Sequence, residues 1–180
     1  MKRTIFITLL AFTTLLCKAQ NQEWTIVSSN VSFKIKNAGF TVNGKFGNAT
    51  GIIQFDPTKT SGNKIEASID TKTINTDNGT RDGHLKKEEY FSVEKYPKIS
   101  MNATAITKET DGKFKGLFTL TIKGISKIVP VLFNFTEQEG KAKLSGSFKI
   151  NRLDYTVGSS SFIMSDDVNI SIEVTCSKKQ

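Results

Sequence analysis

Residues 113–138 read KFKGLFTLTIKGISKIVPVLFNFTEQ, and this stretch decides the fold class. Apolar side chains at Phe118, Leu120 and Ile122 alternate with threonine, and a second alternating run follows through Phe133. A period of two is typical of a β-strand that has one buried face and one face in water. The stretch therefore predicts two successive strands of an antiparallel sheet.

The same alternation recurs along the chain from residue 23 onward. Further runs begin near Val31, Ile65, Ile99, Leu144 and Val168. The dipeptides that indicate turns between runs are Asn43-Gly44, Gly62-Asn63, Asp111-Gly112, Glu139-Gly140 and Gly158-Ser159. Asp111-Gly112 is the strongest of them, because both central residues of a type I′ turn need positive φ. The sequence predicts about eight strands joined as sequential hairpins.

Strand length distinguishes the two architectures open to such a chain. The runs 113–123 and 127–138 are long for a small β-sandwich, and long strands favour a closed barrel, which has no free edge. Pro130 lies inside the second run and removes a ladder hydrogen bond, so we expect a bulge or a strand start there. The predicted fold class is all-β, an eight-stranded antiparallel barrel.

Residues 80–91 show no alternation, and good helix formers follow Gly83. Either Thr80 or Asp82 could cap a short helix by accepting a hydrogen bond from an early backbone N–H. We expect one to two helical turns near residues 81–91, lying across the mouth or the side of the barrel and held by Leu85 and Phe91.

The N-terminus is typical of a secretory signal peptide. Lys2 and Arg3 precede residues 4–16, which are uncharged and number 13, well short of the ~20 needed to span a bilayer. We expect cleavage after Ala19, which leaves one domain over residues 20–180 in the periplasm or outside the cell. No later apolar run approaches spanning length, so no stable membrane insertion is expected.

Cys17 offers an alternative at this terminus, because a lipoprotein signal would make it the acylated residue. Leu16 stands where such a signal needs a small side chain, so we favour simple cleavage. Cleavage leaves Cys176 as the sole thiol. The exported domain therefore has no internal disulfide, and the position of Cys176 in an alternating run predicts a packed side chain.

The charge of the mature chain does not indicate a nucleic-acid partner. Loss of Lys2, Arg3 and Lys18 lowers the formal charge from +8 to +5 and leaves only Arg81 and Arg152 as arginines. Nucleic-acid readers depend on arginine for bidentate contacts. The lysines alternate with apolar residues instead, which is typical of the solvated outer faces of strands.

The only histidine, His84, limits the possible chemistry. Arg81, Asp82 and His84 could form an acid/base set, and Glu88 would share a helix face with His84 as a candidate metal pair. Two ligands do not close a zinc site, and no nucleophile elbow or phosphate loop is present. We favour a structural or mouth motif of Arg81, Asp82, His84 and Leu85, in which the first two pin the helix and His84 bonds a loop carbonyl. We expect no catalytic residue, no metal and no cofactor.

Glycines share the inward register with the phenylalanines, at Gly44, Gly51, Gly116 and Gly146. They could leave an apolar cavity, since an eight-stranded barrel has room for one small ligand. They could equally allow long strands to bend or bulge. Both interpretations remain open at the level of sequence.

A cavity of this kind would suit a long apolar ligand. Burying ~500 Å² at ~25 cal/mol per Å² gives roughly 12 kcal/mol, against association costs of ~4 to 15 kcal/mol. Binding then needs no salt bridge. The residues predicted to line the interior and bind the ligand are Phe33, Ile35, Phe46, Ile53, Phe55, Phe91, Met101, Phe118, Leu120, Phe133, Phe135, Phe148, Phe162 and Met164.

Several motifs together resemble one known family. They are Trp24, Val42-Asn43-Gly44-Lys45-Phe46, Phe55-Asp56-Pro57, Arg81-Asp82-Gly83-His84-Leu85, Lys95-Tyr96-Pro97-Lys98-Ile99, Leu120-Thr121-Ile122-Lys123-Gly124 and Asn151-Arg152. In this order they resemble the YceI-like family of bacterial lipid-binding proteins. The resemblance implies a lipocalin-like eight-stranded barrel, periplasmic or secreted, that binds polyisoprenoid or fatty-acid-derived chains, often as a dimer, with no established catalysis. Tyr90-Phe91-Ser92 and Asp154-Tyr155 depart from the family pattern and leave the identity of the lipid open.

Three functional hypotheses follow. The first is a periplasmic or secreted carrier, store or scavenger of a lipid or isoprenoid, as a monomer or a homodimer. The second is a hydrolase or isomerase centred on Asp82 and His84, which requires both side chains to face a cleft within hydrogen-bonding reach. The third is an interaction module for other envelope proteins.

Overall fold

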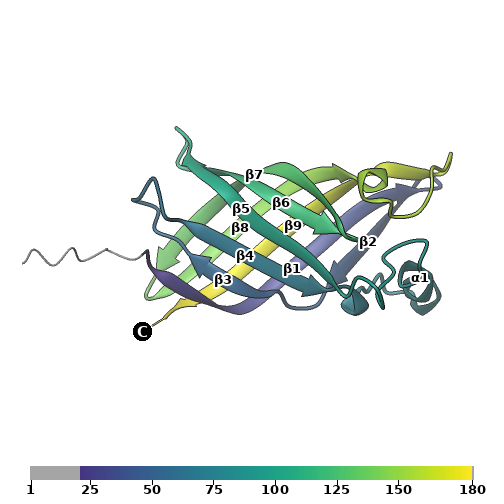
Figure 1. Ribbon diagram of the computed structural model, residues 1–180, viewed down its shortest axis with the longest axis horizontal. Helices are drawn as coiled ribbons and strands as arrows, with labels where there is room; N and C mark the ends of the chain where they lie inside the picture. The colour runs from purple at the N-terminus through teal and green to yellow at the C-terminus, as the bar shows by residue number, and fades with distance from the viewer. Residues whose placement is uncertain (1–20, 180) are drawn as a thin grey trace, which may run out of the picture.

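The computed structural model describes residues 21–179, so the predicted signal peptide lies outside the described residues (Figure 1). The strands of this part are β1 (Glu23–Asn37), β2 (Phe40–Phe46), β3 (Thr50–Gln54), β4 (Lys64–Asp70), β5 (Lys98–Lys108), β6 (Phe114–Ile122), β7 (Ile125–Gln138), β8 (Lys141–Asn151) and β9 (Met164–Lys178). Three short helices accompany them: η1 (Thr71–Thr73), α1 (Gly79–Leu85) and η2 (Arg152–Tyr155).

The strands form a closed antiparallel barrel. β1 pairs with β9 from Trp24 to Asn37 and so joins the first strand to the last. β2 and β3 share one strand position, because β2 pairs with the second half of β1 and β3 with its start, both on the side away from β9. The fold is therefore the predicted eight-stranded barrel with one short α-helix.

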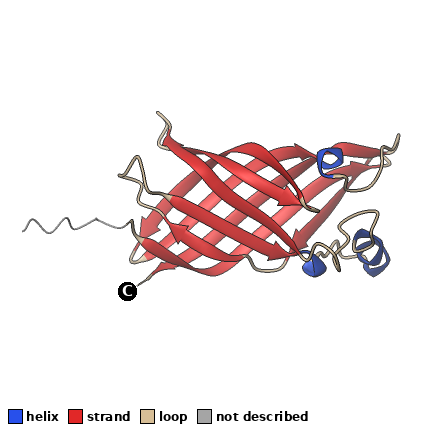
Figure 2. Cartoon of the chain, viewed as in Figure 1, coloured by secondary structure: helices blue, strands red, loops and turns tan. Residues whose placement is uncertain are grey.

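The predicted alternation sets which side chains enter the barrel. Along β6, Phe114, Gly116, Phe118, Leu120 and Ile122 are all buried, and the residues between them face outward. The strands cross the barrel obliquely, and all three helices gather at one end (Figure 2). That end is the mouth in the description below.

One predicted turn is wrong. Asn43-Gly44 lies in the middle of β2, and the hairpin turn is Ala38-Gly39, whose φ angles are 49° and 82°. Gly44 faces the Phe33 ring across the strand pair, and a Cβ there would overlap that ring. The glycine is needed for packing, so its presence did not indicate a turn.

The turn type predicted at Asp111-Gly112 also needs correction. Only Gly112 has positive φ, at 81°, and Lys113 N donates to Asp111 Oδ1 at 3.1 Å. This local hydrogen bond suits an ordinary φ at the aspartate. The paired positive φ values of type I′ turns occur instead at Ala38-Gly39, Lys123-Gly124 and Glu139-Gly140,.

Pro130 occupies the interior of β7 without the expected bulge or strand start. It pairs with Leu117 of β6, and the register of that pair is continuous. The pairing of β7 with β8 begins only at Leu132. At residue 130 the strand therefore has a free side, where a missing N–H costs no ladder hydrogen bond.

The predicted helix is present but shorter and differently capped. Asn78, rather than Thr80 or Asp82, is the N-cap of α1, and its side chain accepts from Arg81 N at 3.0 Å. Asp82 binds the preceding loop, where Oδ1 accepts from N and Oγ1 of Thr76 at 2.9 and 2.6 Å.

Within residues 21–179, no helix has the length and apolar character needed to cross a bilayer.

Candidate ligand-binding cavity

Aromatic rings close the barrel interior at the end away from α1. Phe55 has no exposed surface, and its ring centroid lies 5.0, 5.9 and 4.8 Å from those of Phe114, Phe133 and Phe135. Trp24 packs edge-on against Phe135, and its Nε1 donates to the Phe55 carbonyl oxygen at 2.9 Å. We call these five residues the aromatic plug.

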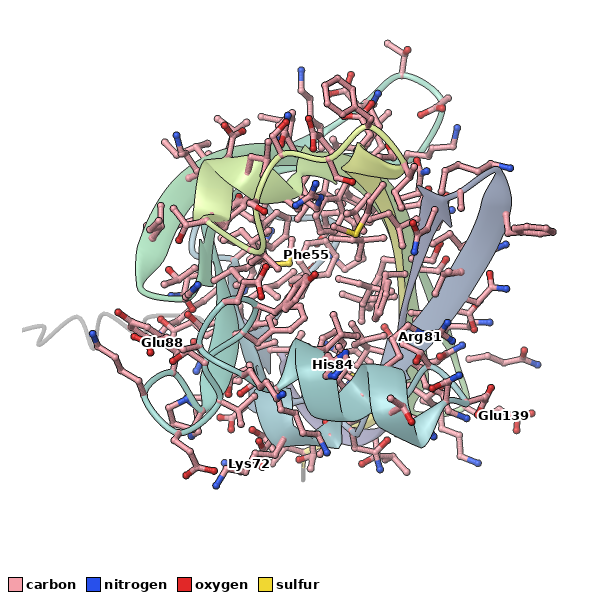
Figure 3. The ribbon with its side chains drawn as sticks, turned by 90° about the vertical axis from the view of Figure 1, so that its right-hand side faces the viewer. Phe55, Lys72, Arg81, His84, Glu88 and Glu139 are labelled. Atoms are coloured by element: carbon pink, nitrogen blue, oxygen red, sulfur yellow. The ribbon has the colours of Figure 1, made fainter. Side chains whose placement is uncertain are left out.

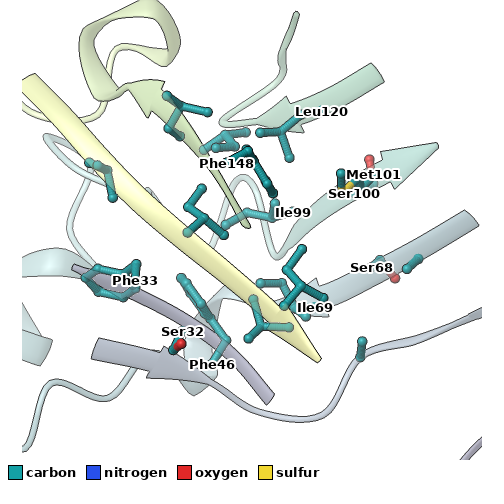
Figure 4. A pocket seen from close by; sticks show the side chains of 18 of the residues that line it. Ser32, Phe33, Phe46, Ser68, Ile69, Ile99, Ser100, Met101, Leu120 and Phe148 are labelled. Atoms are coloured by element: carbon teal, nitrogen blue, oxygen red, sulfur yellow. The ribbon is translucent and has the colours of Figure 1, made fainter. Parts of the chain in front are cut away.

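Between the plug and the mouth lies a cavity of about 250 Å³. One water needs only ~10–15 Å³ of such space, so this is much larger than a packing defect. Figure 4 shows its walls, which come from most strands of the barrel. The aliphatic lining includes Ile26, Val31, Val42, Ile65, Ala67, Ile69, Ile99, Ile122, Val131, Leu144, Ile150, Val168, Ile170, Ile172 and Val174.

The cavity is long and narrow. On β1 its lining residues extend from Ile26 to Asn37. At ~3.3 Å per residue and a strand tilt of ~40°, these positions lie about 28 Å apart along the barrel axis. A volume of about 250 Å³ spread over this length suits an extended chain better than a compact molecule.

Eleven of the fourteen residues predicted for the interior line this cavity: Phe33, Ile35, Phe46, Ile53, Phe91, Met101, Phe118, Leu120, Phe133, Phe148 and Met164. Their contact with a ligand remains a prediction. Phe55 and Phe135 lie inside the barrel but belong to the plug. Phe162 is not in the interior: it is fully exposed, because β9 and its alternation begin only at Met164.

The inward glycines make room for rings. A Cβ at Gly44 or Gly116 would overlap the ring of Phe33 or Phe118, respectively. Each of these rings lies over a glycine and still faces the cavity. The two glycines therefore shape the wall by seating a phenylalanine.

The other two glycines predicted to face inward act differently, and Gly51 is exposed. A Cβ at Gly51 would overlap the carbonyl oxygen of Glu66, so this glycine allows β3 and β4 to approach closely. Gly146 lines the cavity beside Val131 and Phe133. Both interpretations of the glycines therefore hold in part. Gly146 lines the cavity, whereas Gly51 allows two strands to approach closely.

The predicted mouth motif divides between the cavity and the surface. Leu85 and Arg81 line the cavity. The Arg81 guanidinium donates from Nε to Thr76 Oγ1 at 2.7 Å and from Nη2 to the Thr76 carbonyl at 2.8 Å, which fixes the loop before α1. His84 is exposed on α1 at the mouth (Figure 3).

The acid/base hypothesis does not fit this geometry. Asp82 and His84 do not line the cavity, and Asp82 Oδ1 is occupied by Thr76. The predicted helix face shared by His84 and Glu88 does not exist, because α1 ends at Leu85. The imidazole makes no hydrogen bond to a loop carbonyl among residues 21–179, contrary to expectation. Over the same range, no three His, Cys, Asp or Glu side chains are grouped as metal ligands.

Sequence reasoning missed the polar residues that organise the mouth. Arg152 is buried, and it donates to the carbonyls of Ser165 and Val157 at 3.0 Å and to Asp166 Oδ1 at 2.9 Å. These contacts hold η2 against the start of β9. Asn151-Arg152 is one of the motifs that resemble the family, but the chain after β8 shows no strand alternation, so the burial of Arg152 could not be predicted.

Tyr155 is the second such residue. It is 1 % exposed and lines the cavity, and its hydroxyl has no hydrogen-bond partner among the described residues. Burial, with a smaller contribution from the Asp154 charge, raises the pKa of Tyr155 to about 12. The hydroxyl is therefore protonated at neutral pH.

The chain is similar in sequence to several known proteins. A UPF0312 protein of Photorhabdus laumondii is 32% identical over 114 residues, which span 63% of this chain and 57% of that protein. A UPF0312 protein of Vibrio campbellii is 23% identical over 96% of this chain and 98% of its own length. The YCEI protein of Campylobacter jejuni, a solved structure, is 31% identical with a TM-score of 0.71, covering 77% of this chain and 86% of that one.

Two further solved structures share the fold at lower identity. BcnA of Burkholderia cenocepacia superimposes with a TM-score of 0.77 at 22% identity, over 82% of this chain and 95% of that one. A polyisoprenoid-binding domain of Saccharophagus degradans has a TM-score of 0.72 at 14% identity, over 88% and 100%. Residues 24–176, which include almost every strand and the whole mouth, match the YceI-like domain. With the barrel and its cavity, that match establishes that this chain belongs to the YceI-like domain family.

Proposed function

We propose that this protein binds one long apolar chain, a polyisoprenoid or a fatty-acid-derived lipid, in its barrel. In this proposal it carries, stores or scavenges that ligand in the periplasm or outside the cell and catalyses no reaction. The observation that carries the proposal is the cavity itself, about 250 Å³ of space walled by apolar side chains and ended by the aromatic plug.

The energetics support an apolar ligand over a charged one. Burying ~500 Å² of hydrocarbon contributes roughly 12 kcal/mol before association costs. A charged group deep between these walls would lose its hydration with no compensating partner. The fold shared with a polyisoprenoid-binding domain is consistent with this ligand class.

The test is to fill the cavity without adding charge. Ala67 lines the cavity on β4, and its neighbours on the same face, Ile65 and Ile69, are buried. Ala67→Phe would place an aromatic ring in the path of the ligand. Ala105→Phe is the matched control, because Ala105 is exposed on the outside of β5.

We expect organic extraction and mass spectrometry of the purified wild-type protein and of Ala105→Phe to recover a long-chain lipid in near-stoichiometric amount. Ala67→Phe should retain the barrel by circular dichroism and lose most of that lipid. A wild-type protein that emerges empty and takes up no added isoprenoid or fatty acid would refute the proposal.

The proposed location has its own test. Export with cleavage after Ala19 predicts that the mature protein begins at Gln20, which N-terminal sequencing of the protein from an envelope fraction measures. A mature chain that retains Met1, or a lipid-modified Cys17, would contradict it.

A further inference from the structure

Two loops form an exposed apolar tip at the mouth. They are the β1–β2 turn at Ala38-Gly39 and the loop before β9, and Ala38 N donates to the Ile163 carbonyl oxygen at 2.7 Å. Figure 1 shows the two loops side by side at the end of the molecule where α1 lies. Phe40 is 77% exposed, Ile163 is 66% exposed and Phe162 is fully exposed. We call these three residues the apolar tip.

The barrel keeps its other phenylalanines out of water. Phe40 and Phe162 are the only exposed phenylalanines among residues 21–179, and both lie on the apolar tip. Serines at 159–161 precede Phe162 and give the tip a polar border. A single exposed apolar side chain is ordinary, whereas several together with a polar rim mark a contact surface. The apolar tip is therefore a candidate contact surface.

The charges beside the apolar tip are basic. Residues 24–55 include three exposed lysines, Lys34, Lys36 and Lys45, and no acidic residue. Residues 155–165, which contain the second loop, carry no charge. A surface of this kind attracts an anionic partner.

The acidic residues that follow the tip on β9 do not offset this charge, because they are already engaged. Asp166 Oδ1 lies 2.9 Å from Arg152 Nη2, and Asp167 Oδ2 lies 2.7 Å from Lys149 Nζ. Lys36, whose neighbour across β1 and β2 directly precedes or follows the tip, takes part in none of the ion pairs of residues 21–179. Its charge is available to a partner.

The apolar tip is continuous with the rim of the cavity. Asn37 and Met164 both line the cavity, and they pair with each other across β1 and β9. Ala38 and Ile163 are the next residues on the two segments. A partner held by the tip therefore lies at the end of the barrel opposite the aromatic plug.

The size of the tip favours a membrane over a protein. A protein interface of standard size takes about 800 Å² from each partner. Even at ~200 Å² for each of the three side chains, the area of a well-buried phenylalanine, the tip supplies less. Peripheral binding to a bilayer needs only that apolar side chains enter the interface by ~5–10 Å while lysines meet anionic lipid.

We propose that the apolar tip docks the protein reversibly on an anionic lipid bilayer, with Phe40, Phe162 and Ile163 in the interface and the mouth toward the membrane. This docking goes beyond the proposed function and does not depend on it. Only its use, the exchange of a ligand between bilayer and cavity, rests on the proposed function.

The test is flotation of delipidated mature protein with two kinds of vesicle. One is made of phosphatidylcholine and phosphatidylglycerol in equal parts, and the other of phosphatidylcholine alone. One lysine near an anionic surface corresponds to about a fivefold change in affinity. The wild-type protein should therefore bind the anionic vesicles at least fivefold more tightly than the neutral ones.

The apolar contribution is measured with two isoleucines of equal exposure. Ile163→Ser alters the tip, and Ile128→Ser is the matched control, because Ile128 is 67% exposed on the outer face of β7. Withdrawing about 60 Å² of apolar surface from the interface corresponds to roughly tenfold in affinity. Ile163→Ser and Phe162→Ser should each weaken binding roughly tenfold, and Ile128→Ser should not change it. All three sites are exposed, so the variants should keep the wild-type Tm.

The basic contribution has its own pair of variants. Lys36→Gln should weaken binding to the anionic vesicles about fivefold and leave binding to the neutral vesicles unchanged. Lys141→Gln is the control, because Lys141 is exposed at the opposite end of the barrel, where its partner Ser177 precedes Lys178, the residue paired with Trp24. It should change neither affinity.

The outcomes separate the docking from the carrier function. A wild-type protein that binds neither vesicle, or an equal loss in Ile128→Ser and Ile163→Ser, overturns the docking while extracted lipid still supports the carrier function. A wild-type dimer that Phe162→Ser converts to a monomer assigns the tip to self-association and overturns the docking as well. Vesicle binding by a protein that holds no lipid supports the docking and refutes the carrier function.

Discussion

Phe55→Ala tests whether the aromatic plug sets the depth of the cavity. The substitution removes a ring with no exposed surface that contacts three other rings. Burying a phenylalanine contributes about 2 kcal/mol through transfer from water, and replacing one in a core by alanine costs about 4 kcal/mol in total. The remaining 2 kcal/mol, at ~24 cal/mol per Å³, corresponds to about 80 Å³ of new space.

That new space adjoins the existing cavity of about 250 Å³, because Phe133 contacts Phe55 and also lines the cavity. A barrel of this size loses ~2–4 °C of Tm per kcal/mol, so Tm should fall by about 8–16 °C. The enlarged cavity should also accept longer chains. The extracted lipid should therefore shift to greater length, and adding such a lipid should restore part of the lost Tm.

Thermal unfolding of delipidated protein and mass spectrometry of extracted lipid measure the two effects. Phe40→Ala is the control, since Phe40 is 77% exposed and its loss should change stability by less than about 0.5 kcal/mol,. An unchanged Tm in Phe55→Ala would refute the description of the plug as a packed core. A lower Tm with an unchanged lipid length would refute its role as the end of the cavity.

Three further predictions concern groups around the barrel. Asn78→Ala removes the α1 N-cap and should cost about 1 kcal/mol, with faster amide exchange confined to residues 79–85 if the cap acts locally. Arg152→Ala should destabilise the protein by about 2 kcal/mol, because it deprives two backbone carbonyls and Asp166 of donors,; a Tm within 2 °C of wild type would contradict this. Burial raises the pKa of the fully enclosed Cys176 thiol from 9.0 to about 11, so its contribution to stability is complete below pH 9 and falls as the pH rises through about 11. Ellman's reagent at pH 8 should then react only with unfolded protein, and rapid labelling of the native state would show that the thiol is accessible.

The cavity could be predicted only in part. Alternation along a strand predicts which side chains face the barrel interior, but not how far along the barrel axis each side chain lies. Phe55 and Phe118 both read as inward-facing, and both are buried inside the barrel. Phe55 lies in the plug, whereas Phe118 lines the cavity. That difference depends on which strands lie opposite at each level of the barrel, which is a matter of long-range register.

Glycine content likewise predicts the positions of the turns only in part. Asn43-Gly44 has the composition of a hairpin turn, yet a strand continues through it because the Phe33 ring needs the space. Lys123-Gly124, which did not stand out as a turn, adopts the paired positive φ of type I′. Local composition identifies where positive φ is tolerated, and the pairing of neighbouring strands decides where it is used.

The sequence by itself determined the alternating strands, the antiparallel barrel and a short helical segment, predicted near residues 81–91 and found at 79–85, because periodicity and local propensity are properties of neighbouring residues. The tertiary structure alone decided how β2 and β3 share one strand position, the division of the interior into plug and cavity, and the enclosure of Tyr155 and Asn37 without partners among residues 21–179. These features arise between residues far apart in the chain, and only the packed barrel brings them together.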